Sequence, residues 1–393
     1  MRHKKPCYFD YNATTEIAPE VLEAMMPCFT DFWGNPSSAY RFGSQLSKPI
    51  DAARGRIAEL INADPREVIF TSCGSESNNT AIHSALALNP GKRHLLTTAV
   101  EHSAVMTQGK FLRKQGFEVT LLPVESDGSI DLHLLEKSIR QETAIVSIMW
   151  ANNETGVILP IEEIAAICQS KGVAFHTDAV QAVGKLKIDV HSLGADFLSL
   201  SAHKLHAPKG IGALYVNRRT PFQPYLLGGG QERGRRGGTE NVPFILGFGR
   251  AAELALSRLR QEETRVRKMR DRIEQTILET IPNTSRNGSK EERLPNTSNI
   301  AFGSIEAEAI LMELDHVGIC ASSGSACTTG SLEPSHVLLA MGLTREAARS
   351  SVRLSLGYYT TEEDVNHLLD HLPKIIARLR SKSPSSSANE KGE

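Results

Sequence analysis

A lysine and an aspartate each follow an apolar run that is typical of a buried strand. Lys204 ends the sequence Ser-Ala-His-Lys, directly after Phe197–Leu200, and Asp178 ends the run that begins at Val173. Because open α/β sheets hold ligands at the carboxyl ends of their strands, we expect both side chains at one edge. A lysine can form a Schiff base with pyridoxal phosphate (PLP), and a carboxylate can pair with the protonated ring nitrogen that makes PLP an electron sink. We interpret Lys204 and Asp178 as this pair; the alternative is a solvated lysine.

A phosphate site is predicted where the strand-like run Glu67–Ser72 passes into Gly74 and Ser75. A glycine and hydroxyl groups at the start of a helix present free backbone N–H groups and the positive end of the helix dipole. An ordinary helix cap has the same composition. The predicted strand end would place these residues in the same row as Asp178 and Lys204.

His102 and Asn153 also follow predicted strands, at 94–100 and 143–150. Each has a plain structural explanation as well, His102 as a helix-capping or surface imidazole and Asn153 as a turn residue. The sequence alone leaves both explanations open.

The C-terminal part offers a thiol and a guanidinium. Cys327 lies in 321–331, the most glycine- and serine-rich loop of the chain, whereas free cysteines are usually buried as small hydrophobic side chains. An accessible thiol on a mobile loop suits reaction with a bound substrate. Arg353 alternates with apolar neighbours as on a strand, and it is either a sheet-edge charge or a rigid fork for a carboxylate.

The elements that must position these residues alternate between strand and helix. Further strands are predicted at 118–124 and 211–216, and helices at 47–62, 130–141 and 161–171. Repeated β-then-α units favour an α/β fold, with a mainly parallel sheet covered by helices on both faces.

A long helical stretch over about 247–280 leads toward a second domain. We predict an N-terminal arm over 1–15 that packs with the small domain and a large PLP-binding domain over 16–258. A smaller α+β domain over 259–380 would carry the Cys327 loop, and the serine-rich tail over 381–393 would be disordered.

Composition excludes several classes of protein. The formal net charge of −1 gives no general attraction to nucleic acid or to an anionic membrane. The arginine-glycine stretch 228–241 lacks the interleaved aromatic residues of nucleic-acid-binding segments, so we interpret it as a flexible loop that brings basic groups near an anion.

No run approaches the roughly 20 apolar residues that span a bilayer, and no signal peptide is visible, so we expect a cytoplasmic protein. The six cysteines include no Cys-x-x-Cys pair, which argues against a disulfide framework or a four-thiolate zinc site.

Four stretches together resemble the cysteine desulfurases, which are PLP enzymes of the class V aminotransferase type. These stretches are His176–Gln181, Ser201–Lys204, Arg235–Asn241 and Ser322–Cys327. The resemblance extends over about residues 7–380, points to the NifS type in particular, and implies fold type I of the PLP-dependent transferases. The chain departs from many relatives at Cys73-Gly74-Ser75, where they have Gly-Ala-Thr, but the small size and the hydroxyl are kept.

The resemblance also implies a role for each site residue. Lys204 would be the Schiff-base lysine, Asp178 the partner of the ring nitrogen, and His102 the side chain stacked on the ring. Gln181 and Asn153 would lie near the ring hydroxyl and the substrate. The phosphate would be bound by Gly74, Ser75, Ser201, His203 and, from the other subunit of a homodimer, Thr239.

The implied reaction removes sulfur from L-cysteine. Arg353 and Asn153 would bind the substrate, the freed Lys204 amine would remove its α-proton, and the Cys327 thiolate would take the sulfur as a persulfide while alanine leaves. The persulfide would pass to a sulfur acceptor or iron–sulfur scaffold protein, with at most a transient contact between Cys327 and cluster iron. The resemblance leaves open whether the chain serves nitrogenase or general cluster assembly, and whether it also uses selenocysteine.

Two other functions are compatible with parts of the pattern. One is another PLP enzyme on the same fold, such as a selenocysteine lyase or an aminotransferase. The other is a non-catalytic iron–sulfur scaffold, against which the combination of Asp178, Lys204 and Arg353 argues.

Overall fold

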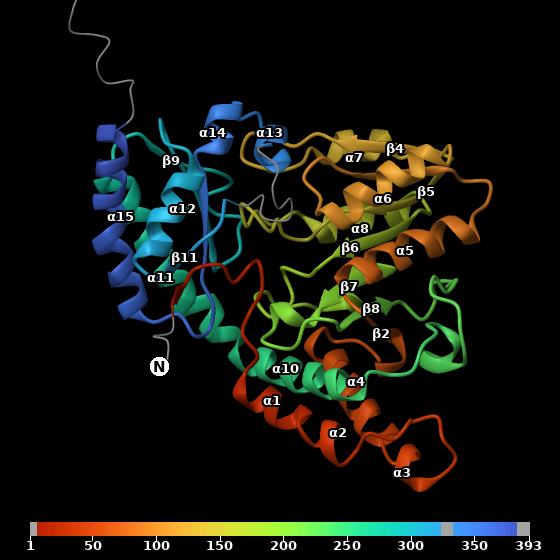
Figure 1. Cartoon of the computed structure of the whole chain (residues 1–393). Helices are drawn as coiled ribbons and strands as arrows, with labels where there is room; N and C mark the ends of the chain where they lie inside the picture. The colour runs from red at the N-terminus through yellow and green to blue at the C-terminus, as the bar shows by residue number, and fades with distance from the viewer. Residues whose placement is uncertain (1–5, 324–332, 383–393) are drawn as a thin grey trace, which may run out of the picture.

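A seven-stranded sheet forms the centre of the computed structural model, which describes residues 6–323 and 333–382 (Figure 1). The strands follow the order β2-β8-β7-β6-β5-β3-β4. Their bounds are β2 (Val68–Thr71), β3 (His94–Thr98), β4 (Glu118–Leu122), β5 (Thr143–Ser147), β6 (Ala174–Asp178), β7 (Phe197–Ser201) and β8 (Gly212–Val216). Strand β8 is antiparallel to both of its neighbours, and the other adjacent pairs are parallel. The predicted α/β fold with a mainly parallel sheet is confirmed.

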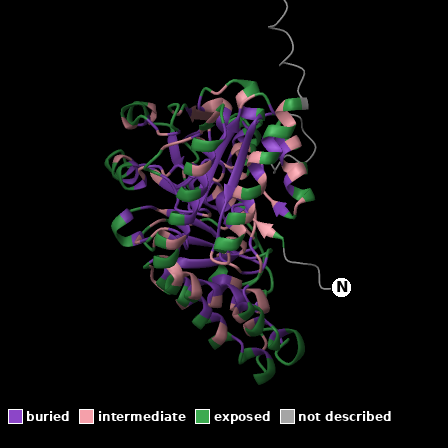
Figure 2. Ribbon diagram, turned by 90° about the vertical axis from the view of Figure 1, so that its left-hand side faces the viewer, coloured by how far each residue is buried: buried purple, intermediate pink, exposed green. Residues whose placement is uncertain are grey.

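Helices cover both faces of this sheet, which is why its strands, apart from the edge strand β4, are buried along nearly their whole length. Leu95 packs in one apolar cluster and Leu96 in another, as the alternation of side chains along a strand requires. Figure 2 shows the buried strands enclosed by helices whose outer faces are exposed. The helices of this part are α1 (Pro19–Met25), α2 (Pro27–Thr30), α3 (Arg41–Ser44), α4 (Ser47–Leu60), α5 (Gly74–Leu88), α6 (Ser103–Lys114), α7 (Leu132–Ser138), α8 (Ile161–Ser170), α9 (Val190–Leu193) and α10 (Val242–Gln261).

A second group of elements, at the left of Figure 1, surrounds an apolar cluster of its own. Its antiparallel sheet has the order β12-β10-β9. The bounds are β9 (Thr284–Arg286), β10 (Thr297–Phe302), β12 (Ser351–Ser355), α11 (Arg267–Thr280), α12 (Ala307–His316) and α15 (Glu362–Lys382). Two short helices, α13 (His336–Ala340) and α14 (Arg345–Arg349), pack in a separate apolar cluster that includes Val100. A π-helical segment, η4 (Glu262–Val266), joins α10 to α11.

The N-terminal arm lies against this second group. Strand β1 (Cys7–Tyr8) pairs in parallel with β11 (Ile319–Cys320), and Phe9 belongs to the same apolar cluster. The domain boundaries drawn from the sequence stay a prediction. The tail that we expected from 381 lies outside the described residues, except that 381–382 end α15.

The arginine-glycine stretch is anchored to the large sheet. Glu232 forms a buried two-point pair with Arg54, at 2.6 and 2.8 Å, and accepts a hydrogen bond from the Phe70 N–H. Arg236 pairs with Glu76 on α5. Arg236 and Glu232 therefore act within the protein, which the sequence did not indicate because their partners Glu76 and Arg54 lie far away along the chain. No helix within the described ranges is long and apolar enough to cross a membrane.

Candidate active site

A cavity of about 280 Å³ lies where β6 and β7 end. This volume is close to the lower end of the range for small-molecule sites, about 300–1,000 Å³. Among the described residues, every predicted site residue except Thr239 lines it: Gly74, Ser75, His102, Asn153, Asp178, Gln181, Ser201, His203, Lys204 and Arg353. Side chains from distant parts of the sequence thus meet at one place.

The Asp178 carboxylate is held by two donors. The Asn78 side-chain amide donates to Oδ2 at 2.6 Å, and the Val180 N–H donates to Oδ1 at 3.0 Å. The first donor comes from α5, and the second follows β6 directly. Asp178 is buried. The carboxylate is therefore fixed in one orientation at the edge of the cavity.

Lys204 ends a short 3₁₀ turn, η2 (Ala202–Lys204), that follows β7. Its Nζ donates to the carbonyl oxygens of Asn12 and Ala13, at 2.6 and 2.7 Å. Thr15 ties the same arm to the turn, because both its N–H and its hydroxyl donate to the His203 carbonyl. The N-terminal arm thus positions the lysine amine.

The start of α5 fits a phosphate group. A Cβ atom at Gly74 would lie 2.8 Å from Val180 Cγ2 and 3.4 Å from Ser201 Cβ, so glycine permits this close approach. The free N–H groups of the first turn and the positive end of the helix dipole favour an anion here. The Ser75 and Ser201 hydroxyls add two potential donors on the cavity wall.

His203 contributes hydrogen bonding, not charge, to this region. Burial, with the Lys204 charge adding to it, lowers the pKa of His203 to about 3. Its Nδ1 lies 3.2 Å from the Thr14 hydroxyl. The imidazole is therefore neutral near pH 7.

His102 is both a helix cap and a wall of the cavity. Its Nδ1 accepts a hydrogen bond from the Ala104 N–H at 3.2 Å at the start of α6. Burial lowers the pKa of His102. The Asp178 charge opposes this lowering, and the Lys204 charge adds to it. His102 therefore caps α6 and also lines the cavity, so the helix-capping role and the site role that the sequence left open are compatible with each other.

Arg353 reaches the cavity from β12 in the second group of elements. One Nη donates to Asp10 Oδ1 at 2.6 Å and the other donates to the Asn153 carbonyl at 3.0 Å. The residue is 2% exposed, and its buried Nε has no hydrogen-bond partner among the described residues. A guanidinium has five N–H donors, so Arg353 keeps further donors for a ligand in the cavity that it lines.

The comparisons with known proteins agree with this geometry. The sequence model of the family described as aminotransferase class-V matches residues 7–368, and a cysteine desulfurase of Nostoc sp. is 54% identical over 377 residues, which is 96% of this chain and 94% of the relative. The chain belongs to the cysteine desulfurases of the class V aminotransferase family. The cysteine desulfurase NifS of Azotobacter vinelandii is 50% identical over 383 residues, covering 97% of this chain and 95% of that one.

The fold of this chain also resembles solved structures of NifS-like proteins. A solved structure described as a NifS-like protein has a TM-score of 0.90 at 37% identity, and the match covers 95% of this chain and 100% of that chain. Members of the family are known PLP enzymes. The resemblance that the motifs indicated is therefore confirmed, and with it the assignment to fold type I.

Two predicted residues remain. Thr239 is exposed and does not line it. Cys327, together with the iron contact considered for it, lies outside the described residues. Within 6–323 and 333–382, no group of three or more histidine, cysteine or acidic residues is arranged to hold a metal ion.

Sequence reasoning missed several residues of the cavity wall. Asn78 lies four residues after Gly74 on α5, so helical periodicity could have indicated it. Asn12 carried no comparable signal, because the pairing of β1 with β11 sets the course of the arm. The missed residues are Asn12, Ala13, Cys73, Asn78, Met149, Ala151 and Val180.

Proposed function

We propose that the chain removes sulfur from L-cysteine with PLP as its cofactor, releases L-alanine and retains the sulfur as a persulfide on Cys327. One observation carries the proposal: Lys204, Asp178 and Arg353 face a single cavity. Their types suit a Schiff base, a ring-nitrogen partner and a carboxylate fork.

The cofactor would be held along the cavity wall. Lys204 would bind it covalently, Asp178 would pair with its ring nitrogen, and His102 would stack on the ring. Gln181 would lie near the ring hydroxyl. The phosphate would be bound by Gly74, Ser75, Ser201 and His203.

Bound PLP supplies an electron sink for negative charge at the substrate α-carbon. Arg353 binds the substrate carboxylate with guanidinium N–H groups that Asp10 and Asn153 leave unused, while Asp10 fixes the orientation of the guanidinium. Asn153 lies beside it and confines the substrate. The Lys204 amine, once released, takes the α-proton. The Cys327 thiolate attacks the substrate sulfur, so that an S–S bond forms as the Cβ–S bond breaks and the Cβ carbon takes up a proton.

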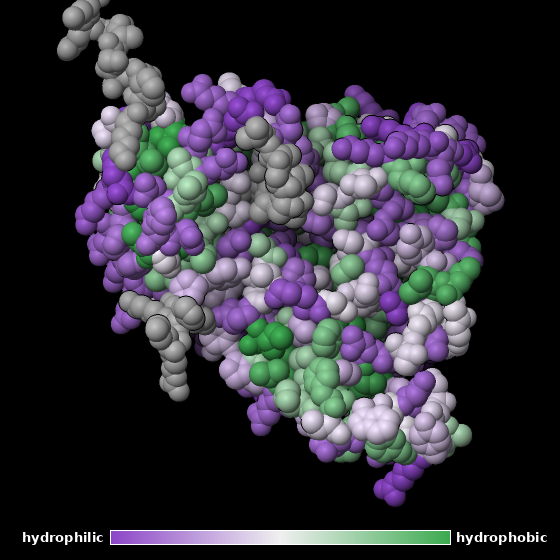
Figure 3. Space-filling view, viewed as in Figure 1, coloured by the Kyte–Doolittle hydropathy of each residue, from purple (hydrophilic) through white to green (hydrophobic). Residues whose placement is uncertain are grey.

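A homodimer would complete the phosphate site with Thr239 of the second copy. The exposure of Thr239, away from the cavity of its own chain, supports this arrangement. Large apolar side chains are also exposed around α1 and α2, where Figure 3 shows apolar groups near the lower end of the molecule. They include Leu22, Met26, Phe29, Phe32 and Trp33.

The persulfide would be delivered to a sulfur acceptor or iron–sulfur scaffold protein. The likeness to a relative named NifS supports cluster assembly for nitrogenase as the destination. A relative named IscS, from Clostridium botulinum, is 47% identical over 383 residues, so general cluster assembly is the second candidate.

The test is release of alanine and sulfide from L-cysteine under anaerobic reducing conditions. Cys327→Ser should abolish both products and leave the PLP absorbance in place, whereas Cys7→Ser, a matched control on β1, should retain activity. Alanine formation that survives Cys327→Ser would favour a lyase or aminotransferase. A colourless protein without alanine formation would favour the scaffold.

A further inference from the structure

Lys185 is a buried cation that the proposed chemistry does not use. It is 7% exposed and lies in the turns that follow β6. Its Nζ donates to both the carbonyl oxygen and the side-chain Oε1 of Gln181, each at 3.0 Å. The neighbouring Gly184 makes this turn feasible, because its φ is +77° and a Cβ there would lie 2.3 Å from Leu205 Cδ2.

These contacts decide which way the Gln181 amide faces. An ammonium group is a donor only, so the amide oxygen must point to Lys185 and the NH₂ group must point the other way. There Nε2 donates to the Asn12 carbonyl at 3.0 Å, the same oxygen that accepts from Lys204 Nζ. One amide hydrogen is used in this bond, and the second remains for the cavity that Gln181 lines.

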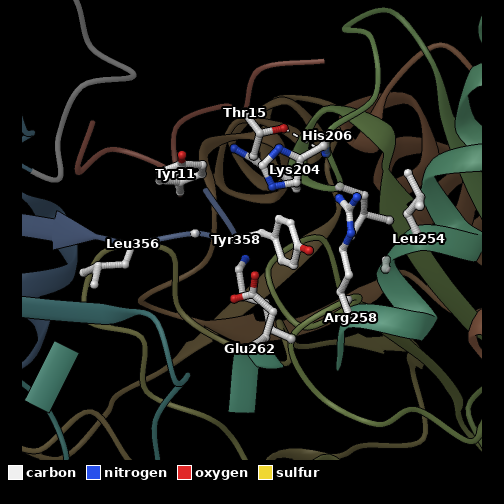
Figure 4. A pocket seen from close by; sticks show the side chains of 14 residues that line it. Tyr11, Thr15, Lys204, His206, Leu254, Arg258, Glu262, Leu356 and Tyr358 are labelled. Carbon is white, nitrogen blue, oxygen red and sulfur yellow. Dashed lines mark hydrogen bonds between the residues drawn. The ribbon is translucent and has the colours of Figure 1, made fainter. Parts of the chain in front are cut away.

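Glu262, a buried carboxylate, lines a small cavity together with Lys185 and favours the charged form of the lysine. Figure 4 shows a second cavity, of about 40 Å³, which Lys204, Arg258 and Glu262 line together with Lys185. Glu262 belongs to the π-helical segment η4 and is 8% exposed. Burial lowers the pKa of Lys185 to about 8, and the Glu262 charge opposes that effect. Arg258 is itself paired with Glu20. The two Gln181 oxygens thus hold the Lys185 ammonium group, and the Glu262 carboxylate favours its charge.

We propose that Lys185 is a positioning residue that holds the Gln181 amide with its NH₂ group toward the ring oxygen of bound PLP. The proposal rests on the proposed function, since it concerns the same cofactor. A donor at that oxygen stabilises its negative charge. Without Lys185 the amide can turn over and present its oxygen instead, and the ring oxygen then holds a proton more strongly.

The test compares Lys185→Met with Lys187→Met, an exposed lysine two residues along the chain. The readout is the pH dependence of the absorption band of bound PLP, with the PLP dissociation constant as a second measurement. In Lys185→Met the midpoint should rise by about 0.5 pH unit or more, and PLP should bind several-fold more weakly. Lys187→Met should match the unaltered chain. An unshifted midpoint in Lys185→Met overturns the proposal.

Two further variants separate positioning from a general structural effect. In a Gln181→Ala background, Lys185→Met should move the midpoint no further; an equal shift there contradicts a role through Gln181. Gln181→Glu keeps Lys185 but places an oxygen on the cavity side, so it should shift the midpoint. This variant tests the proposal even if Lys185→Met fails to fold, and an unchanged midpoint in it overturns the proposal. Absence of the PLP band from the unaltered chain would overturn the cofactor assignment and this proposal together. An unshifted midpoint in Lys185→Met, with the band present in the unaltered chain, would overturn only this proposal.

Discussion

Asn78 donates a 2.6 Å hydrogen bond to Asp178, joining α5 to the end of β6 across 100 residues of sequence. Four residues earlier, Gly74 opens the same helix at the proposed phosphate site. Four helical residues span about 6 Å along the axis. Helix α5 therefore sets the distance between Gly74, which would bind the phosphate, and Asn78, which orients Asp178, the proposed partner of the ring nitrogen.

We expect Asn78→Ala to weaken PLP binding by about tenfold or more, because a hydrogen bond to a charged group contributes about 1.5–3 kcal/mol. Asp178 would keep only the Val180 N–H. Titration of the apoprotein with PLP measures the effect. Asn79→Ala, one residue further along, is the control, because the Asn79 side chain bonds the Ser75 carbonyl instead. Equal affinities in the two variants would contradict the role of Asn78.

Gly74→Ala should reduce both stability and PLP affinity. The new methyl group would lie 2.8 Å from Val180, whose N–H holds Asp178, and forcing an extra methyl into a packed site costs about 1–3 kcal/mol. Chemical denaturation and PLP titration report the two effects. Gly91→Ala serves as the comparison, since a Cβ there meets no atom within 4 Å. A Gly74→Ala protein that binds PLP normally would show that the close approach is unnecessary.

Glu101 should make stability depend on pH. Burial raises the pKa of Glu101 from 4.5 to about 8, although Thr98 and the Met149 N–H donate to the carboxyl. Because the folded state binds the proton more tightly than the unfolded state, stability falls as the pH rises from about 4.5 to about 8. Glu101→Gln cannot ionise, so its melting temperature should fall less over this range.

Thermal unfolding at several pH values measures this dependence. Glu163→Gln, an exposed position on α8, should retain the pH dependence of the unaltered chain. Parallel curves for Glu101→Gln and the unaltered chain would mean that Glu101 does not titrate in this range.

Arg353→Lys should raise the KM for L-cysteine by about tenfold or more, because a lysine ammonium is a point charge and cannot replace a planar fork. The PLP band should change little, since the residues proposed to bind the cofactor lie elsewhere on the cavity wall. Steady-state kinetics and the absorption spectrum provide the two readouts. Arg345→Lys, an exposed residue that pairs with exposed Glu333, is the control. An unchanged KM in Arg353→Lys would remove the residue from the substrate site.

Local patterns predicted the part of the site that lies at strand ends. The apolar runs before Asp178 and Lys204 are β6 and β7, and their parallel pairing brings both residues to one edge. The start of α5 at Gly74 could be read in the same way, since a strand followed by glycine and hydroxyl residues is a local signal. The alternation of Arg353 with apolar neighbours placed it correctly on a strand, but it did not indicate that Asp10 is its partner.

The sequence by itself determined which chemical groups this protein offers: the lysine, the carboxylate, the predicted phosphate site and the motifs that its family shares. Only the tertiary structure decided which atoms hold these groups in place. Asn12 reaches Lys204 across 192 residues because β1 pairs with β11, and Glu262 faces the cavity behind Lys204 because η4 passes there. Such contacts follow from how distant elements pack together, and the periodicity within any one segment carries no information about them.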